Sequence, residues 1–267
     1  MAASILKKIV KNKKAELKVK KEKMPVKELL KEIMKTPANR NFRDIFEYGN
    51  FLVIGEIKKK APSMGKIRSA VNIKKKVKAY ESAGVKAVSV VTDKKFFDGK
   101  PEYISEAKKY CGLPVLRKDF IIDEYQIYES RFLRADAVLL IASLLEKREL
   151  NSFVRKVRSL NMTPVVEAAT KEEIKRAVSS GTDIIGINTR DLKTFKINPN
   201  RMKNLVKYVP KDKIVICESG VKKLEDLEKF MISPVIKGLL VGTMFMKSTD
   251  RQIKDFMSDA VYRYDIE

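Results

Sequence analysis

The chain contains no histidine and no tryptophan, and it has only two cysteines among 267 residues. Without histidine, catalytic triads and imidazole acid–base catalysis are excluded, so any proton transfer must use Lys, Glu, Asp, Tyr or Cys. Zinc sites also lose their usual ligands, because no two cysteines have the CxxC spacing. Cys111 and Cys217 fall in or beside apolar stretches, where a free thiol behaves as a small hydrophobic residue. We therefore expect neither a disulfide nor a metal site.

Long apolar runs are also missing. No stretch approaches the roughly 20 apolar residues that a membrane-spanning helix needs. The first residues lack the apolar region and cleavage site of a secretory signal. We therefore expect a cytoplasmic protein, a monomer or weak homo-oligomer, without a membrane partner.

The composition is strongly basic, with 57 Lys and Arg against 34 Asp and Glu and a formal net charge of +23. Such a charge can bind nucleic acid through its phosphates. However, most of the excess is lysine spread along the chain, and patches with interleaved aromatic residues that could stack on bases are absent. We therefore expect a small anionic metabolite, rather than nucleic acid, as the partner.

Eight short apolar runs alternate with helical stretches from about Phe51 onward. The runs are almost continuously apolar, as expected for parallel strands that are buried on both faces. Eight such units in one chain of this length predict an α/β protein with a single (β/α)8 TIM barrel, because a doubly wound sheet rarely needs eight evenly spaced parallel strands. The expected strands are residues 51–57, 87–92, 114–118, 136–142, 164–168, 183–188, 214–219 and 238–242.

Residues 1–50 predict an N-terminal helical extension that caps the barrel of residues 51–267, in one domain overall. Two helical pieces, 5–19 and 26–35, are separated by Pro25. The first piece is rich in lysine, which is typical of a solvated helix face; the alternative is a helix that covers one mouth of the barrel. The lysines in and just after it are Lys7, Lys8, Lys11, Lys13, Lys14, Lys18, Lys20 and Lys21.

Further helices are expected between the strands, among them 73–83, 124–133, 144–160, 171–180 and 224–230. Asp123, Ser143 and Thr170 are suitable N-caps, because their short polar side chains can accept a hydrogen bond from a first-turn N–H. Thr170 and Glu173 have the spacing of a capping box.

Polar residues stand at the carboxyl ends of the expected strands, where barrels of this type build their active sites. Charged groups in apolar runs need partners or a function, because unpaired burial is unfavourable. A structural salt bridge explains any one of them, but less easily all of them at one end of one barrel. Two glycine turns after the seventh and eighth strands also suit phosphate, which binds there through backbone N–H groups. The candidates are Glu56, Lys58, Lys118, Glu167, Asn188, Arg190, Glu218, Ser219, Gly220, Gly242 and Thr243.

These segments resemble those of the indole-3-glycerol phosphate synthase family over nearly the whole chain. The most specific match is LRKDF at 116–120 followed by YQI at 125–127. GINTRDL at 186–192 is a strong match in combination with ESG at 218–220. The other matching segments are EIKKKAPS at 56–63, ADAVLLI at 135–141 and VGT at 241–243.

The resemblance implies an enzyme of tryptophan biosynthesis that converts 1-(2-carboxyphenylamino)-1-deoxyribulose 5-phosphate to indole-3-glycerol phosphate. The reaction releases CO2 and water and uses no metal or organic cofactor. Lys118 would be the general acid on the ribulose carbonyl, and Glu167 would transfer protons in the later dehydration. Lys58, with Glu56 beside it, would hold and polarise the substrate, and whether Lys58 shares the acid role with Lys118 is left open. Lys58, Glu56 and Asn188 are counted as catalytic with Lys118 and Glu167. The other implied roles are hydroxyl contacts by Asn188 and Glu218, an anion contact by Arg190, phosphate binding by Ser219, Gly220, Gly242 and Thr243, and packing on the aromatic ring by Phe97, Phe120, Leu139 and Leu192.

Three departures from the family pattern concern loop geometry and affinity more than reaction type. Ala61 stands where a serine is usual, Ala168 and Ala169 replace a valine–histidine pair, and Arg134 replaces a glycine. None of them removes a proposed catalytic group.

Two other functions are left open by the residues alone. One is another phosphate-binding barrel enzyme, either a Schiff-base aldolase, which borohydride would trap on a lysine, or a sugar-phosphate isomerase. The other is a non-catalytic barrel that binds anions or nucleic acid, which a salt-dependent gel shift without turnover would indicate.

Overall fold

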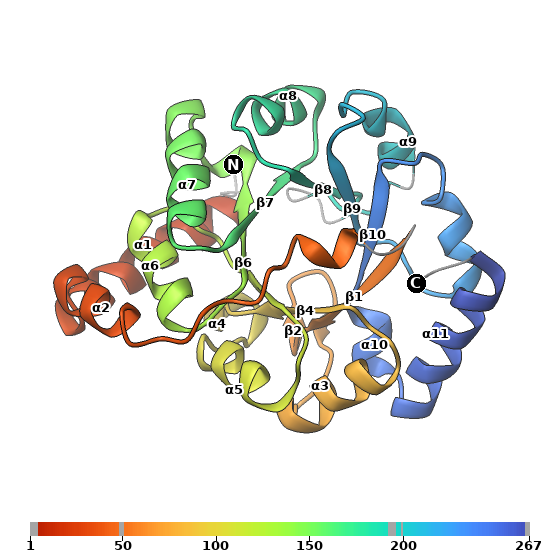
Figure 1. Cartoon of the computed structure of the whole chain (residues 1–267), viewed down its shortest axis with the longest axis horizontal. Coiled ribbons are helices and arrows are strands. Elements are labelled where there is room, and N and C mark those ends of the chain that lie inside the picture. Colours follow the sequence, from red (N-terminus) through yellow and green to blue (C-terminus); the bar gives the residue numbers. More distant parts are fainter. Residues whose placement is uncertain (1–4, 48–50, 192–195, 199, 265–267) are drawn as a thin grey trace.

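The computed structural model of the chain describes residues 5–47, 51–191, 196–198 and 200–264. Its strands are β1 (Leu52–Ile57), β2 (Lys60–Ala61), β3 (Gly65–Lys66), β4 (Ala87–Val91), β5 (Val115–Lys118), β6 (Ala137–Ile141), β7 (Thr163–Ala168), β8 (Ile184–Asn188), β9 (Ile214–Glu218) and β10 (Ile236–Val241). Eight of them close into a barrel of parallel strands in the order β1-β10-β9-β8-β7-β6-β5-β4, while β2 and β3 form an antiparallel hairpin (Figure 1). The predicted TIM barrel is confirmed, and each expected strand has a counterpart whose ends lie within two residues.

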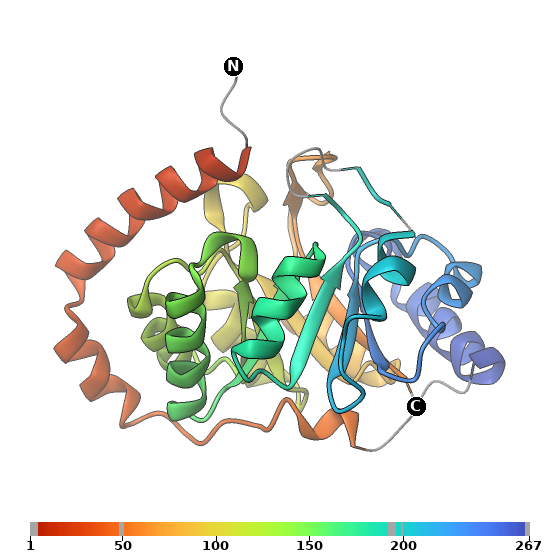
Figure 2. The ribbon, with the colours of Figure 1, turned by 90° about the horizontal axis from the view of Figure 1, so that it is seen from above.

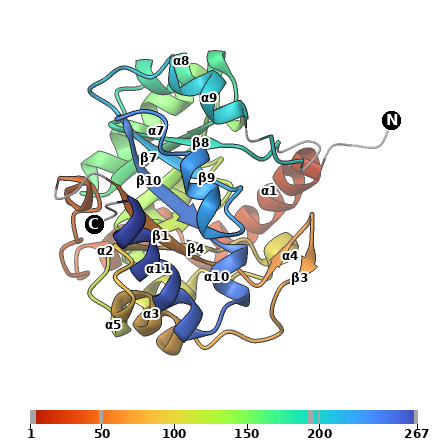
Figure 3. The same ribbon diagram turned by 90° about the vertical axis from the view of Figure 1, so that its right-hand side faces the viewer.

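Helices surround the barrel on its outside (Figure 1). The α-helices are α1 (Ile5–Lys23), α2 (Val26–Ile33), α3 (Ile73–Ser82), α4 (Lys94–Phe97), α5 (Glu102–Tyr110), α6 (Glu124–Phe132), α7 (Lys147–Ser159), α8 (Lys171–Ser179), α9 (Asn200–Val206), α10 (Thr243–Lys247) and α11 (Asp250–Tyr264), and the 3-10 helices are η1 (Asp44–Phe46), η2 (Ala142–Leu144) and η3 (Leu224–Lys229). Helix α11 packs on α3 and completes the ring (Figure 3). Among the described helices, none combines the length and apolar character needed to cross a membrane.

Two of the three predicted N-caps are confirmed. The side chain of Asp123 accepts a hydrogen bond from the first turn of α6, and that of Thr170 accepts one from the N–H of Glu173. The capping box at Thr170 is only half correct, because the Glu173 carboxylate accepts from the N–H of Ala169 rather than from that of Thr170.

The predictions for 144–160 and 224–230 need correction. Ser143 does not cap a helix but lies inside η2, and the buried Leu145 holds the chain extended after it. Helix α7 therefore starts at Lys147, with Glu146 as its N-cap in a capping box. The segment 224–230 forms the 3-10 helix η3, which ends at Lys229, rather than an α-helix.

Alternation along the barrel strands separates two apolar layers. Ile54, Leu116 and Leu139 belong to a cluster inside the barrel, whereas their strand neighbours, such as Val53 and Val115, pack outward in the larger cluster beneath the helices. The direction of every polar side chain at a strand end follows from this alternation.

The chain before β1 wraps around one flank of the barrel and then crosses beneath it (Figure 2). Helix α2 packs on α6. Phe42 and Phe46, in the segment that leads to β1, are buried with the interior cluster. Phe46 lies 3.1 Å from the place that a Cβ on Gly238 would take. Because Gly238 is near the start of β10, Phe46 closes the amino-terminal mouth of the barrel.

The lysines of α1 divide into two kinds. Of the eight named above, six are exposed and Lys20 is half-buried, as expected for a solvated helix face. Lys13 differs, because it is buried against the barrel.

Candidate active site

Alternation sends polar side chains into the barrel at the carboxyl ends of its strands. Leu116, Val165 and Ile216 belong to the interior cluster, and residues two positions further along a strand point the same way. The register places these strand ends at one level, since Ile141 pairs with Glu167 and Asn188 pairs with Glu218. The side chains brought together in this way are Lys118, Glu167, Asn188 and Glu218.

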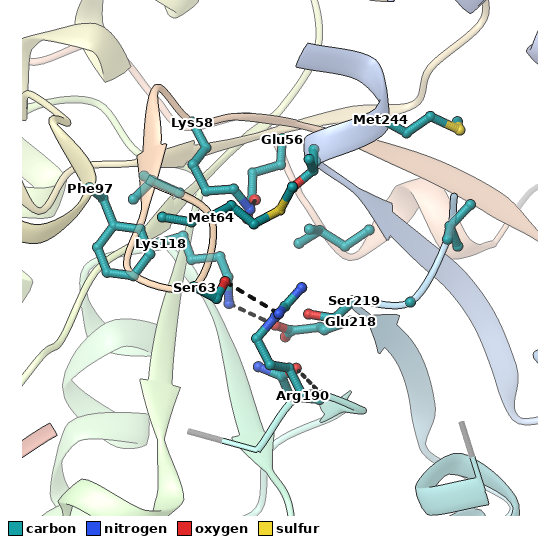
Figure 4. Close-up of a pocket in the computed structure, with 18 of the residues that line it drawn as sticks. Glu56, Lys58, Ser63, Met64, Phe97, Lys118, Arg190, Glu218, Ser219 and Met244 are labelled. Atoms are coloured by element: carbon teal, nitrogen blue, oxygen red, sulfur yellow. Dashed lines mark hydrogen bonds and ion pairs between the residues drawn. The ribbon is translucent and has the colours of Figure 1, made fainter. Parts of the chain in front are cut away.

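Lys118 lies at the centre of an ionic group built from alternate strands of the barrel, β5, β7 and β9 (Figure 4). Its Nζ donates to Glu218 Oε2 at 2.6 Å and to Glu167 Oε2 at 3.0 Å. Asn188 Nδ2 donates to Glu167 Oε1 at 3.1 Å, so this carboxylate is held from two sides. The side chains of Glu167 and Glu218 are 3% and 2% exposed and that of Lys118 is 19% exposed, so Lys118 is the most accessible of the three.

Burial and charge together set the protonation of this group. Burial alone would lower the pKa of Lys118, but the charges of Glu167 and Glu218 outweigh it and hold the pKa well above its usual value. For Glu167, burial is outweighed by the charge of Lys118, and the pKa is lowered. Burial, together with the charge of Glu167 and against the pull of Lys118, raises the pKa of Glu218 to about 8. The pKa values of the two carboxyl groups are thus shifted in opposite directions, and Glu218 is the one that holds a proton more tightly.

Gly186 makes room for Glu218 and was missed from the sequence. It pairs with Glu167 in the register of β7 and β8, and a Cβ at this position would overlap Glu218 Oε1. A glycine inside an apolar strand is a known sign of close approach, so GIN at 186–188 carried a usable signal.

A second ion pair lies at the same rim. Lys58 Nζ is 2.5 Å from Glu56 Oε1, and both residues come from β1 and its carboxyl end. A Cβ on Gly242 would overlap Glu56 Oε1 and lie 3.1 Å from Lys58 Nζ. The absence of a side chain at Gly242 therefore lets this pair lie over the turn after β10.

The predicted groups line one cavity of about 720 Å³. Phe97 and Phe120 form an apolar wall, with their ring centroids 5.9 Å apart, and Leu139 lines the cavity beside them. Leu192, the fourth residue expected to contact an aromatic ring, lies outside the described residues. The cavity thus offers a slot for a flat apolar group on the side of β5 and β6.

Two turns line the opposite side of the cavity, after β9 and β10. Ser219 and Gly220 both have positive φ, +66° and +103°. Thr189 Oγ1 donates to the carbonyl oxygens of Glu218 and Ser219, both at 3.1 Å, and so fixes the first turn. The second turn contributes the other two residues predicted to bind phosphate, Gly242 and Thr243. The loops after these two strands are the recurrent phosphate site of TIM barrels.

The hairpin of β2 and β3 also contributes to the cavity, through residues 61–64, and was not expected from the sequence. Lys59 Nζ lies 2.6 Å from Asp98 Oδ2 on one side of it. On the other side, Arg190 Nη1 donates to Ser63 Oγ at 3.4 Å (Figure 4). Strands of two residues carry too few positions to show an alternating pattern, so no signal could have found them.

Exposed lysines at the rim add positive charge beside the turns after β9 and β10. Lys222 and Lys247 both line the cavity, and neither was singled out among the many lysines of the sequence. In the part of the chain that the structure describes, no group of three or more carboxylate or thiol side chains is arranged to hold a metal ion.

A family model for indole-3-glycerol phosphate synthase matches residues 6–256. The chain belongs to this family. The indole-3-glycerol phosphate synthase of Caldanaerobacter subterraneus subsp. tengcongensis is 46% identical over 253 residues, which cover 95% of this chain and 97% of the relative. That of Thermoanaerobacter pseudethanolicus is 43% identical over 258 residues, which cover 96% of this chain and 98% of the relative. The chain accordingly has indole-3-glycerol phosphate synthase activity, a carboxy-lyase reaction of tryptophan biosynthesis on a phosphorylated substrate.

Solved structures of other enzymes share the barrel of this chain. An N-acetylmannosamine-6-phosphate 2-epimerase from Clostridium perfringens aligns with a TM-score of 0.59 and 15% identity, covering 84% of this chain and 99% of the epimerase. KGPDC from Streptococcus mutans aligns with a TM-score of 0.59 and 13% identity, covering 80% and 98%. At these identities the similarity shows the fold alone.

Proposed function

We propose that Lys118 is the general acid of indole ring closure in this cavity. The substrate is 1-(2-carboxyphenylamino)-1-deoxyribulose 5-phosphate, and the products are indole-3-glycerol phosphate, CO2 and water. The observation that carries the proposal is the position of the Lys118 ammonium between Glu167 and Glu218, in a cavity with an aromatic wall on one side and two glycine turns on the other.

Ring closure requires a proton on the ketone oxygen while the aromatic carbon that bears the carboxylate attacks the ketone carbon. The developing alkoxide is a far stronger base than an amine, so Lys118 can donate to it although its pKa is raised. Loss of CO2 then returns the electrons of the broken C–C bond to the ring. One proton is taken up per turnover. Glu218 can return it to the amine, because its pKa is raised and its Oε2 lies 2.6 Å from Lys118 Nζ.

The last step removes water as a hydroxyl group and a carbon-bound proton. It therefore needs one group that gives a proton and one that takes it. Lys118 and Glu167, whose Nζ and Oε2 atoms are 3.0 Å apart, supply one of each, and Asn188 holds Glu167 in place.

The two ends of the substrate fit the two sides of the cavity. The anthranilate ring packs against the wall formed by Phe97 and Phe120, where apolar side chains exclude water and strengthen nearby polar contacts. The phosphate binds at the turns after β9 and β10 under Lys58, which Glu56 orients. The remaining assignments are ring contacts by Leu139 and Leu192, phosphate contacts by Ser219, Gly220, Gly242 and Thr243, hydroxyl contacts by Asn188 and Glu218, and an anion contact by Arg190.

The position of Lys118 argues against a Schiff-base aldolase. A lysine that attacks a carbonyl must be neutral, and burial or neighbouring cations lower the pKa of such residues. Here the neighbouring carboxyl groups of Glu167 and Glu218 favour the ammonium form instead. Borohydride treatment with substrate should leave Lys118 unmodified.

The role of Lys118 and Glu167 is tested by following indole-3-glycerol phosphate formation through its fluorescence. We expect Lys118→Ala and Glu167→Gln each to lower kcat by about 10²–10⁴-fold, as loss of a positioned proton-transfer group does. Lys86→Ala, an exposed change at the amino-terminal end of β4, is the control. Turnover near that of the wild type in either active-site variant, with the fold confirmed by circular dichroism, would contradict the role given to that residue.

A further inference from the structure

Lys13 is the buried lysine of α1, and its ammonium group joins two loops at the rim of the barrel. Its Nζ lies 3.0 Å from Asp119 Oδ1 and 3.1 Å from both Asp93 Oδ2 and Glu16 Oε2. The residue is only 5% exposed. Burial opposes its charged form, but Asp119 and Asp93 outweigh this and raise the pKa of Lys13, so it is a cation at any working pH.

Asp119 links Lys13 to the catalytic lysine. It follows Lys118 directly, and its Oδ2 accepts hydrogen bonds from Thr92 Oγ1 at 2.6 Å and from Arg117 Nη2 at 3.1 Å. The carboxylate thus ties the backbone that leaves β5 to the end of β4. Lys13 supplies the cation on the other oxygen of the same carboxylate.

Asp93 links Lys13 to the aromatic wall. Its Oδ1 accepts a hydrogen bond from the N–H of Phe96 at 2.8 Å and caps α4, the short helix that carries Phe97. Asp93 is fully buried. Its ion-pair partner among the described residues is Lys13. Removing the ammonium would leave a buried carboxylate without a charge partner, which is strongly unfavourable. Asp93 would then move toward water and take α4 with it.

We propose that Lys13 is a positioning residue of the active site, which sets the placement of the Phe97 wall relative to Lys118 by holding Asp93 and Asp119 together. This inference rests on the proposed function, because the wall binds the ring while the lysine acts on the adjacent carbonyl. Helix α1 is thereby part of the geometry of the substrate slot, although it contributes no residue to the cavity lining.

The test compares Lys13→Met with Lys14→Met, which removes the next lysine, an exposed one, from the same helix. We expect Lys13→Met to lower kcat/KM by about 10- to 100-fold, mostly through KM, as small misplacements of reacting groups do. Lys13→Arg keeps the charge and should recover much of this loss, and Lys14→Met should behave like the wild type. Kinetics are measured where circular dichroism shows every variant to be folded. A purely stabilising role of Lys13 would leave the KM of the folded enzyme unchanged, and that result would overturn the proposal.

A second variant tests the same link from its other end. Asp93→Asn keeps an oxygen to cap α4 but removes the charge that Lys13 holds. If the two residues act through each other, the double variant should lose little more than either single one; multiplicative losses would contradict the link. Asp93→Asn also takes over the test if Lys13→Met fails to fold.

Calorimetric binding of indole-3-glycerol phosphate to these proteins separates the two proposals, because it needs no turnover. A wild type without turnover would overturn the proposed function, whereas weaker binding by Lys13→Met than by Lys14→Met would still support the positioning role. Equal binding by these two variants would contradict it.

Discussion

Glu218 changes its charge near neutral pH, because burial and the neighbouring Glu167 raise its pKa to about 8. The usual value is 4.5, so the folded state binds this proton more tightly than the unfolded state does. The resulting stabilisation is complete below about pH 4.5 and is lost as the pH rises toward about 8. Glu167 has a lowered pKa, and its contribution is constant over this window because it changes only below its usual value.

We therefore predict that the free energy of unfolding of the wild type falls between about pH 4.5 and pH 8 by an amount that is absent in Glu218→Gln. Urea titrations across this range measure the effect. The difference in the free energy of unfolding between the wild type and Glu218→Gln should shrink or change sign with rising pH. If the two proteins instead show parallel curves of this free energy against pH, Glu218 does not titrate in this range.

At the residue scale, the sequence indicates the polar residues inside the barrel better than it indicates the residues that hold them in position. Lys118 and Glu167 interrupt apolar strands, so their burial and their direction both follow from the strand pattern. Lys13 carries no such signal, because it lies among many lysines of one helix and its partner Asp93 is 80 residues away in the sequence. Its burial results from tertiary packing, which local patterns do not report.

Arg134, where the resemblance led us to expect glycine, occupies the position after the C-cap of α6. Its φ is +69°, a left-handed conformation that suits glycine. The N–H of Ala135 donates back to the carbonyl of Ser130 at 2.9 Å, so the helix end requires this turn. The departure from the family pattern thus affects a helix terminus far from any catalytic group.

We predict that Arg134→Gly raises the free energy of unfolding by about 1 kcal/mol through relief of this backbone strain. Loss of the like charge near Arg131 acts in the same direction. Arg134→Ala is the matched control, because it removes the charge but keeps a Cβ at positive φ. Urea denaturation should rank glycine above alanine, and equal stabilities would mean that the conformation carries little strain.

At the element scale, long periodic segments are predictable and short ones are not. All eight barrel strands have the apolar runs of doubly buried strands, whereas the hairpin at 60–66 is held by contacts with distant residues such as Arg190. The 3-10 helix η3 shows the same limit. Asp226 Oδ2 accepts from the N–H groups of Lys222 and Lys223, which tightens the turn in a way that apolar spacing does not reveal.

The net charge of +23 acts on the whole molecule and faces a substrate with a carboxylate and a phosphate. The exposed lysines at the rim beside the turns after β9 and β10, Lys222 and Lys247, add to this attraction. We predict that kcat/KM falls, mainly through KM, as the salt concentration rises from about 0.1 M to about 1 M and the Debye length shrinks from about 10 Å to about 3 Å.

The contribution of the rim is measured with the double variant Lys222→Gln/Lys247→Gln. Its kcat/KM should depend less steeply on salt than that of the wild type, while Lys86→Gln at the opposite end of the barrel keeps the wild-type slope. If the two slopes agree, the charge of the molecule as a whole, rather than that of the rim, attracts the substrate.

Phe46, which closes the amino-terminal mouth of the barrel, lies at the end opposite the active site, so stability and catalysis can be changed separately. Phe46 fills the space above Gly238 at one end of the barrel, and Lys118 lies at the other. Heat tolerance can therefore be selected by repacking the residues around Phe46, and new ring-closing chemistry by redesigning the cavity at the other end. Because the two sets of positions are far apart, their effects should be nearly independent.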